Sequence, residues 1–173
     1  GETPADYVLR TAVTKLMDGI AAKNELDDPR MDAPVLAADT VVSLEGKILG
    51  KPRDREEAAR FMRELSGRTH EVRTAVAVGR SREDYRALVV LSKVTMRQIS
   101  EEEIGRYVMT DEPYDKAGGY GIQGLAGLFV QSVAGSYTGI MGLPVCEAAE
   151  LLKSYGAPAP ALFQPMPTSS TSK

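Results

Sequence analysis

The chain has a single cysteine and a single histidine, and both scarcities narrow its chemistry. With Cys146 alone, no disulfide can form within the chain, which agrees with a reducing compartment. Its neighbours open an expected helix, so we expect Cys146 to be a buried structural thiol and not a nucleophile. With His70 alone, a zinc site built on several histidines is excluded. We interpret His70 as structural, with a backbone hydrogen-bond partner.

The chain also lacks an excess of positive charge and any long apolar run. Its 21 Lys and Arg face 24 Asp and Glu, a net charge of −3. No nucleic-acid polymer is therefore expected as a partner, because coating phosphate backbones requires basic excess. No run is long enough to span a bilayer, so no membrane partner is expected. The patterns GxxxxGK[ST] and GxGxxG and the serine elbow of hydrolases are absent too.

The chain does contain alternating helix and strand patterns over most of its 173 residues. This length suits one domain, or one domain with two lobes. The periodicities predict helices over 3–23, from Asp54 to about Gly67, from Ser100, and over 144–155, and strands over 34–42, 47–50, 70–78, 86–98 and 128–133. The alternation indicates an α/β protein with a mixed sheet flanked by helices. Residues 156–173 are rich in Pro, Ala, Ser and Thr, and we expect them to form a flexible tail.

Capping residues support two of the helix starts. Asp54 with Glu57, and Ser100 with Glu103, have the spacing of capping boxes. Gly67 stands where a left-handed residue ends a helix.

One carboxylate, Asp39, is expected at the end of the apolar strand 34–42. Open α/β sheets place their chemistry at such strand ends, beside a crevice. A carboxylate there can bind magnesium or activate water, and either role suits phosphate-ester hydrolysis. From position alone, Asp39 could equally cap a turn or pair with a nearby basic residue.

Two lysines and one amide are candidates for binding a ligand. Lys51 precedes a proline that keeps its backbone extended, so it could hold phosphate as a point charge. Lys116 and Gln123 lie in the glycine-rich run 115–124, whose backbone can approach a ligand closely. Gln123 has the donors and acceptor to pair with the O4 and N3–H edge of uracil or thymine. Each of these side chains could also be simply solvated. Together with Asp39 they suggest a nucleotide enzyme.

Six segments, in this order, resemble the Maf family of nucleoside triphosphate pyrophosphatases. They are PADYVLR (4–10), AADTVV (37–42), ILGKP (48–52), ELSGRTHEVRTAVAV (64–78), EPYDKAGGYGIQG (112–124) and GLPVCE (142–147). The likeness extends from residue 3 to about residue 153, which implies one Maf-like domain over 1–155. It also implies a two-lobed α/β fold with a central cleft, similar to inosine-triphosphate pyrophosphatases.

The resemblance implies a reaction and roles for five residues. A nucleoside triphosphate and water would give the monophosphate and pyrophosphate. Asp39 matches the catalytic acid, as general base or metal ligand, and Lys51 matches a phosphate-binding lysine. Lys116 belongs to the second binding loop, while Thr40 and Gln123 match positions of base choice. The DTVV and YGIQ sequences are typical of the branch acting on dTTP, UTP or modified pyrimidine nucleotides.

The resemblance further implies a divalent cation, Mg²⁺ or Mn²⁺, a cytoplasmic location and a possible homodimer. Maf sequences normally open with a strand, a SerxSerProArgArg loop and an AspGlu pair, and this chain starts after them. We therefore expect an N-terminally incomplete enzyme. The alternative is a non-catalytic Maf-like module that binds a nucleotide or a partner in cell-division regulation. The missing arginines favour this alternative, because phosphoryl chemistry needs positive charge. Arg10 and Lys15 lie on the first helix, but their spacing does not assign them that role.

Overall fold

The computed structural model describes residues 1–26 and 32–157. Residues 27–31 of the expected polar loop and 158–173 of the expected tail lie outside the described residues. The helices are α1 (Pro4–Asn24), α2 (Arg55–Leu65), α3 (Glu101–Tyr107), α4 (Tyr137–Ile140) and α5 (Val145–Ser154), with 3-10 turns η1 (Glu112–Asp115), η2 (Ala117–Gly119) and η3 (Leu125–Phe129). The strands are β1 (Val35–Leu44), β2 (Lys47–Leu49), β3 (Thr69–Gly79), β4 (Tyr85–Met96) and β5 (Val130–Ala134).

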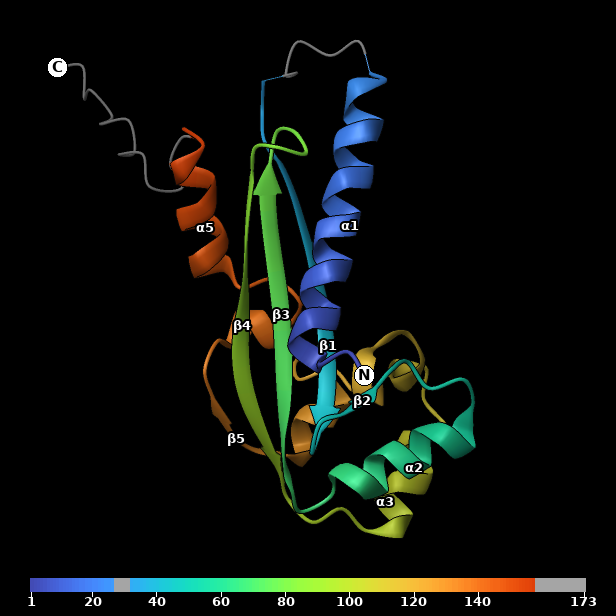
Figure 1. Cartoon of the computed structure of the whole chain (residues 1–173). Helices are drawn as coiled ribbons and strands as arrows, with labels where there is room; N and C mark the ends of the chain where they lie inside the picture. Colours follow the sequence, from blue (N-terminus) through green and yellow to red (C-terminus); the bar gives the residue numbers. More distant parts are fainter. Residues whose placement is uncertain (27–31, 158–173) are drawn as a thin grey trace, which may run out of the picture.

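The five strands form one sheet in the order β2-β1-β3-β4-β5 (Figure 1). Every pairing among the described strands is antiparallel, so the predicted mixed sheet is wrong for this part of the chain. Tight turns explain part of the difference. Glu45 and Gly46 both have positive φ, which is the two-residue turn that reverses a strand into a hairpin. The α/β class with flanking helices is confirmed.

One face of the sheet is covered by α1, which runs along it (Figure 1). The apolar residues of α1 at helical spacing, Val8, Ala12, Leu16 and Ile20, are all buried. Val8 and Ala12 pack with Val41 of β1 and Ala75 of β3. Because strand side chains alternate between faces, the odd-numbered residues of β1 face α1 and the even-numbered ones face away.

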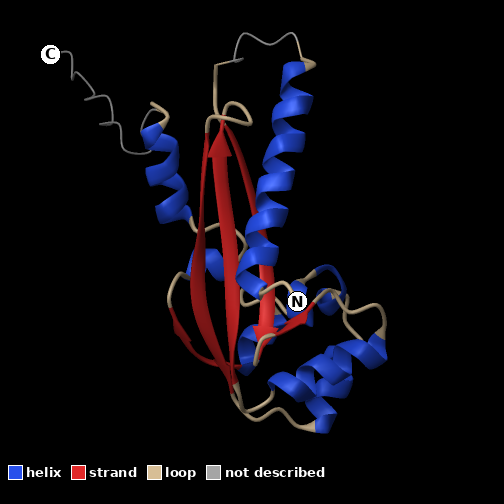
Figure 2. Cartoon of the chain, viewed as in Figure 1, coloured by secondary structure: helices blue, strands red, loops and turns tan. Residues whose placement is uncertain are grey.

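The larger core lies on the other side, at the end of the sheet where α2 and α3 pack (Figure 2). Val42 and Leu44 of β1 belong to it. The predicted capping box of α3 is complete. In α2, Asp54 accepts from the N–H of Glu57 as predicted, but Glu57 binds the N–H and guanidinium of Arg53 instead of the N–H of Asp54. Only half of that box therefore forms.

The C-terminal part differs most from the sequence prediction. The strand expected over 128–133 begins only at Val130, because the preceding residues form η3. The short helix α4 was not predicted. Cys146 is exposed, so its prediction as a buried thiol is wrong. On α5 the buried residue is Ala148, and two residues along a helix amount to about 200° of rotation, which turns Cys146 outward.

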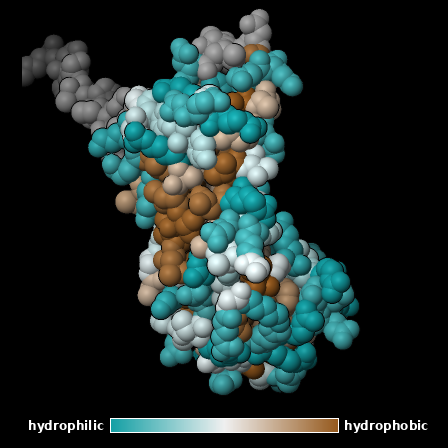
Figure 3. Space-filling view, in the orientation of Figure 1, coloured by the Kyte–Doolittle hydropathy of each residue, from teal (hydrophilic) through white to brown (hydrophobic). Residues whose placement is uncertain are grey.

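The face of the sheet beside α1 shows an exposed patch of hydrophobic side chains (Figure 3). Leu91 of β4 is among the exposed large apolar residues. Within the described residues, β5 pairs with β4 only over 93–96, and β2 pairs with β1 only over 42–44. The outer edge of β1 over 35–41 therefore has no strand neighbour in this part of the chain. Nor, within 1–26 and 32–157, does any helix combine the length and apolarity needed to cross a bilayer.

Candidate functional site

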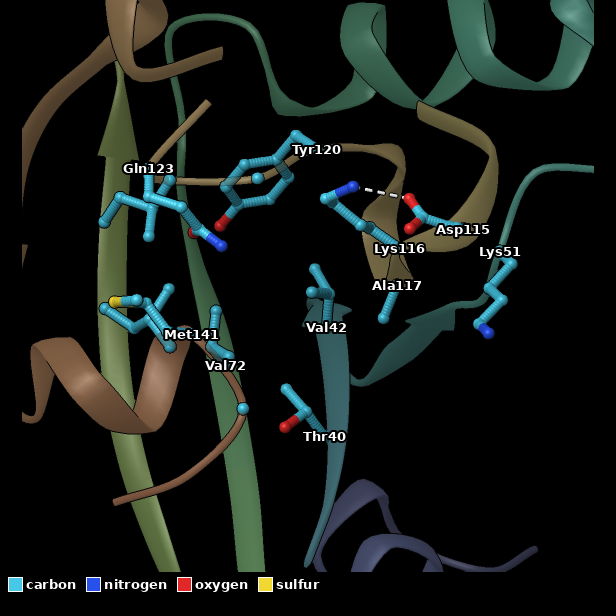
Figure 4. Close-up of a pocket in the computed structure, with 14 residues that line it drawn as sticks. Thr40, Val42, Lys51, Val72, Asp115, Lys116, Ala117, Tyr120, Gln123 and Met141 are labelled. Carbon is cyan, nitrogen blue, oxygen red and sulfur yellow. Dashed lines mark hydrogen bonds and ion pairs between the residues drawn. The ribbon is translucent and has the colours of Figure 1, made fainter. Parts of the chain in front are cut away.

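A cavity of about 250 Å³ lies on the sheet face opposite α1. Its floor is formed by β1 and β3, and its roof by the glycine-rich loop and the residues after α4 (Figure 4). Four of the five residues predicted from the sequence line it: Thr40, Lys51, Lys116 and Gln123. These residues come from segments far apart in the chain, and the fold brings them to one place.

The fifth, Asp39, does not line the cavity. It is the fifth of ten residues in β1, so the prediction that it ends a strand is wrong. Thr40 faces the cavity, and alternation therefore directs Asp39 to the α1 face. There its Oδ1 accepts a hydrogen bond of 2.5 Å from Lys15 Nζ on α1. Pairing with a basic residue was one of the alternatives that the sequence left open.

The sequence did not identify Lys15 as part of the site. Its signal is faint, since Lys15 directly precedes the buried Leu16 on a helix that packs against β1. The Asp39 side chain is 16% exposed and the Lys15 side chain 53% exposed, so solvent reaches the pair.

The two lysines of the cavity lie near the carboxylate of Asp115, which belongs to the same loop as Lys116. Lys116 Nζ donates to Asp115 Oδ1 at 2.5 Å (Figure 4) and to the carbonyl of Glu112 at 3.3 Å. This hydrogen bond, with a smaller contribution from Lys51, lowers the pKa of the Asp115 carboxyl. Lys51 and Lys116 thus give one side of the cavity a cationic character.

Tyr120 forms a wall of the cavity that the sequence analysis missed. Its hydroxyl lies 2.6 Å from Nε2 of His70, and the two rings meet edge to face. His70 is 1% exposed, and burial lowers its pKa to about 4. His70 therefore carries no charge near neutral pH. Its structural role agrees with the interpretation from sequence, but its partner is a tyrosine side chain instead of the backbone.

Glu112 organises the loop that carries Gln123. Its carboxylate accepts from the backbone N–H groups of Leu125 at 2.6 Å, Ala126 at 3.0 Å and Gly121 at 3.4 Å, and from the Tyr107 hydroxyl at 3.1 Å. Burial alone would raise its pKa, but these donors lower it below the usual value. The loop is folded around one ionised carboxylate.

Two glycines of this loop are required by close approach. A Cβ at Gly124 would lie 2.3 Å from a Glu112 carboxylate oxygen. At Gly118, φ is +72° and a Cβ would lie 2.8 Å from the Val42 side chain. The glycine-rich composition therefore allows the loop to close against both the carboxylate and β1.

The described residues offer little for a resident metal ion. No three His, Cys, Asp or Glu side chains gather into a metal-binding group within 1–26 and 32–157. Magnesium at nucleotide sites is often held by one or two carboxylates together with substrate phosphates. Asp39, whose Oδ1 is bonded to Lys15, has one carboxylate to offer, and the described donors do not form a cage made by the protein alone.

The cavity has two chemical characters along its length. In Figure 4, Lys51 lies at one side and Gln123 at the other, with Tyr120 and Lys116 between them. Val72 and Met141 add apolar lining near Gln123. An amide beside aromatic and apolar groups suits a planar base, and two ammonium groups suit phosphates.

Comparison with known proteins gives consistent matches over most of the chain. A family model described as "Maf-like protein" matches residues 1–155. The dTTP/UTP pyrophosphatase of Dechloromonas aromatica is 52% identical over 157 residues, which are 90% of this chain and 76% of that protein. The dTTP/UTP pyrophosphatases of Bordetella parapertussis and Escherichia coli K12 are 52% and 48% identical, over 92% and 90% of this chain, and 76% of each is covered.

Proposed function

Because this chain belongs to the Maf family, we propose that it is a nucleoside triphosphate pyrophosphatase acting on dTTP and UTP. Modified pyrimidine triphosphates would be substrates of the same kind. The products are the nucleoside monophosphate and pyrophosphate. The observation that carries the proposal is the single cavity in which Thr40 and Gln123 accompany Lys51 and Lys116.

The base would occupy the side of the cavity formed by Tyr120, Gln123 and Met141. Tyr120 offers a rigid aromatic wall, because its hydroxyl is anchored to His70. Gln123 and Thr40 offer hydrogen-bonding atoms for the edge of a pyrimidine. This arrangement supports a role of both residues in base choice.

The phosphates would lie toward Lys51 and Lys116. Lys116 is engaged by Asp115, and a triphosphate carries more negative charge than one carboxylate. Phosphate oxygens would therefore compete for the Lys116 ammonium. Two ammonium groups would stabilise the negative charge that grows on the leaving pyrophosphate.

Asp39 would act as the general base. Asp39 and Thr40 are consecutive, so their Cα atoms are only about 3.8 Å apart although their side chains leave opposite faces. The edge of β1 over 35–41 has no strand neighbour in the described part of the chain, so a nucleotide crossing this edge can approach both residues. Competition by phosphate for Lys15 would release Asp39 to take a proton from water.

The attacking water bonds to the α-phosphorus, its proton passes to Asp39, and the bond to the oxygen bridging the α and β phosphates breaks. Mg²⁺ or Mn²⁺, when bound, would neutralise phosphate charge, and Asp39 is the residue that could hold it. Lys51 and Lys116 orient the leaving pyrophosphate.

Residues 1–155 would form the catalytic domain, followed by the tail from 156. A two-lobed body would place the cavity in its central cleft. A homodimer is the assembly that we propose from the family resemblance.

The test is pyrophosphate release from dTTP, UTP, CTP, ATP and GTP with Mg²⁺ or Mn²⁺. We expect turnover of dTTP and UTP well above that of the purine nucleotides. Nucleotide binding without any turnover would contradict the proposed pyrophosphatase activity and favour the non-catalytic module.

A further inference from the structure

Three oxygen atoms form a short chain behind the floor of the cavity. Thr40 and Thr74 are directly opposite each other on β1 and β3, and their hydroxyl oxygens lie 2.8 Å apart. The Thr74 hydroxyl also lies 2.6 Å from the backbone carbonyl oxygen of Gly139 in α4. Thr74 is 1% exposed, while Thr40 lines the cavity.

The number of protons fixes the direction of both hydrogen bonds. A carbonyl oxygen has no proton, so Thr74 must donate to Gly139. Each hydroxyl has one proton, so Thr74 has none left for Thr40. Thr40 must therefore donate to Thr74, and the lone pairs of its oxygen stay available to accept a hydrogen bond in the cavity that Thr40 lines. A threonine hydroxyl normally rotates to suit its partner, but the Thr40 proton is already used in the hydrogen bond to Thr74.

The Gly139 carbonyl, the last of these three oxygen atoms, is held in place by the turn to which it belongs. Gly139 donates its N–H to the Ser136 hydroxyl, and its oxygen also accepts from the N–H of Gly142. A Cβ at Gly139 would lie 3.1 Å from the Ser136 side chain. The position of the acceptor is therefore set by α4 and does not depend on Thr74 alone.

We propose that Thr74 fixes Thr40 as a hydrogen-bond acceptor, so that the cavity selects a ring N–H, the N3–H of uracil and thymine, over the unprotonated N3 of cytosine. This inference rests on the proposed function and refines it. Uracil and thymine present a donor at N3 between two carbonyls. Cytosine presents an acceptor at N3, which would face the acceptor of Thr40 without a proton between them.

Gln123 cannot supply this discrimination by itself. Its side chain lines the cavity and is exposed, and an amide that turns over exchanges its donor and acceptor. It can therefore match either pyrimidine. Thr40 cannot adapt in this way while it donates its hydroxyl proton to Thr74. Thr74 is thus a positioning residue for specificity, and it acts through Thr40.

The test compares Thr74→Val, which keeps the shape and removes the hydroxyl, with Thr74→Ser, which keeps the hydroxyl. The ratio of kcat/KM for UTP to that for CTP is measured for each. We expect the wild type and Thr74→Ser to prefer UTP by about 10-fold or more, as expected when a buried polar group is left unpaired. In Thr74→Val the Thr40 hydroxyl can turn and donate, so the ratio should fall by about 10-fold. An unchanged ratio would overturn the proposal.

Two further measurements keep the outcome clear. If Thr74→Val does not fold, Thr74→Cys, whose thiol is a weak donor of similar size, should give an intermediate ratio, and a wild-type ratio would count against the proposal. Equilibrium binding of UMP and CMP to the same proteins needs no turnover. If no triphosphate is cleaved but UMP selectivity still depends on Thr74, the proposed enzyme fails and the inference stands. If UTP is cleaved and selectivity ignores Thr74, only the inference fails.

Discussion

Lys15 Nζ lies 2.5 Å from Asp39 Oδ1, and this pair joins α1 to β1 on the face of the sheet opposite the cavity. Pairing gives the carboxylate a defined position in the absence of a nucleotide. It also brings a cation next to the acid that would activate water. Under the proposed function, the pair would connect the first helix to the chemistry, a relationship that the spacing along the chain did not reveal.

We expect Asp39→Asn to reduce kcat by at least about 100-fold, because an amide cannot accept the proton of the attacking water. The fold should be largely retained, since the side chain is partly exposed and isosteric. Pyrophosphate release and thermal unfolding measure the two effects. Asp18→Asn, on the same helix as Lys15, is the matched control. Turnover near that of the wild type would remove Asp39 from the chemistry.

Gln123→Ala should weaken the discrimination between pyrimidine and purine triphosphates, by about 10-fold in the ratio of kcat/KM for UTP to that for ATP. The reason is that the variant loses hydrogen-bonding atoms at the base side of the cavity. Gln131→Ala, an exposed glutamine on β5, is the control and should leave the ratio unchanged. An unaltered ratio in Gln123→Ala would assign base reading elsewhere.

Lys51→Ala should lower kcat/KM for UTP by about 10-fold, because a phosphate contact is lost. The effect should shrink as ionic strength rises, since salt screens exposed charges. Lys153→Ala removes an exposed lysine of α5 and serves as the comparison. Equal effects of the two substitutions would mean that only net charge matters.

Glu112→Gln should destabilise the protein by about 1–3 kcal/mol, because the amide nitrogen cannot accept the N–H groups that the carboxylate gathers. Activity should fall as well, since the same loop carries Gln123. Urea unfolding and kcat/KM report the two quantities. Glu102→Gln changes an exposed carboxylate on α3 and is the matched control. Wild-type stability in Glu112→Gln would show that the loop does not depend on this carboxylate.

The lowered pKa of His70 should make the free energy of unfolding depend on pH. Burial lowers its pKa in the folded protein to about 4, against about 6.5 when unfolded. The unfolded chain therefore binds the proton first as pH falls. Protonation of His70 in the unfolded chain therefore costs the protein no stability above pH 6.5. Between pH 6.5 and pH 4 it lowers the free energy of unfolding by about 3 kcal/mol. His70→Gln should make the free energy of unfolding depend less steeply on pH in that range. Equal slopes for both proteins would contradict the assignment.

Local patterns in the sequence were enough to predict most elements. The helix expected over 3–23 is confirmed by α1, and Gly67 has the left-handed backbone predicted for it. Strand direction was not accessible in the same way, because the pattern of a strand does not state the orientation of its neighbour. The predicted mixed sheet failed for that reason.

The site was predicted unevenly for a similar reason. Thr40, Lys51, Lys116 and Gln123 could be named from motifs, and the fold brings them to one cavity. Their unpredicted companions, such as Thr74 and Tyr120, are buried here, and their residue types alone do not mark them as part of a site. Only the pairing of β1 with β3 and the closure of the loop show that they touch the site.

The alternation of side chains along β1 has a consequence for sequence change. Deleting one residue between Val35 and Asp39 would shift every later side chain to the other face, if the pairing with β3 were kept. Asp39 would then point into the cavity and Thr40 toward α1. Length changes should therefore be nearly forbidden within this strand. By contrast, the hairpin turn between β3 and β4 could gain or lose a residue without disturbing either face.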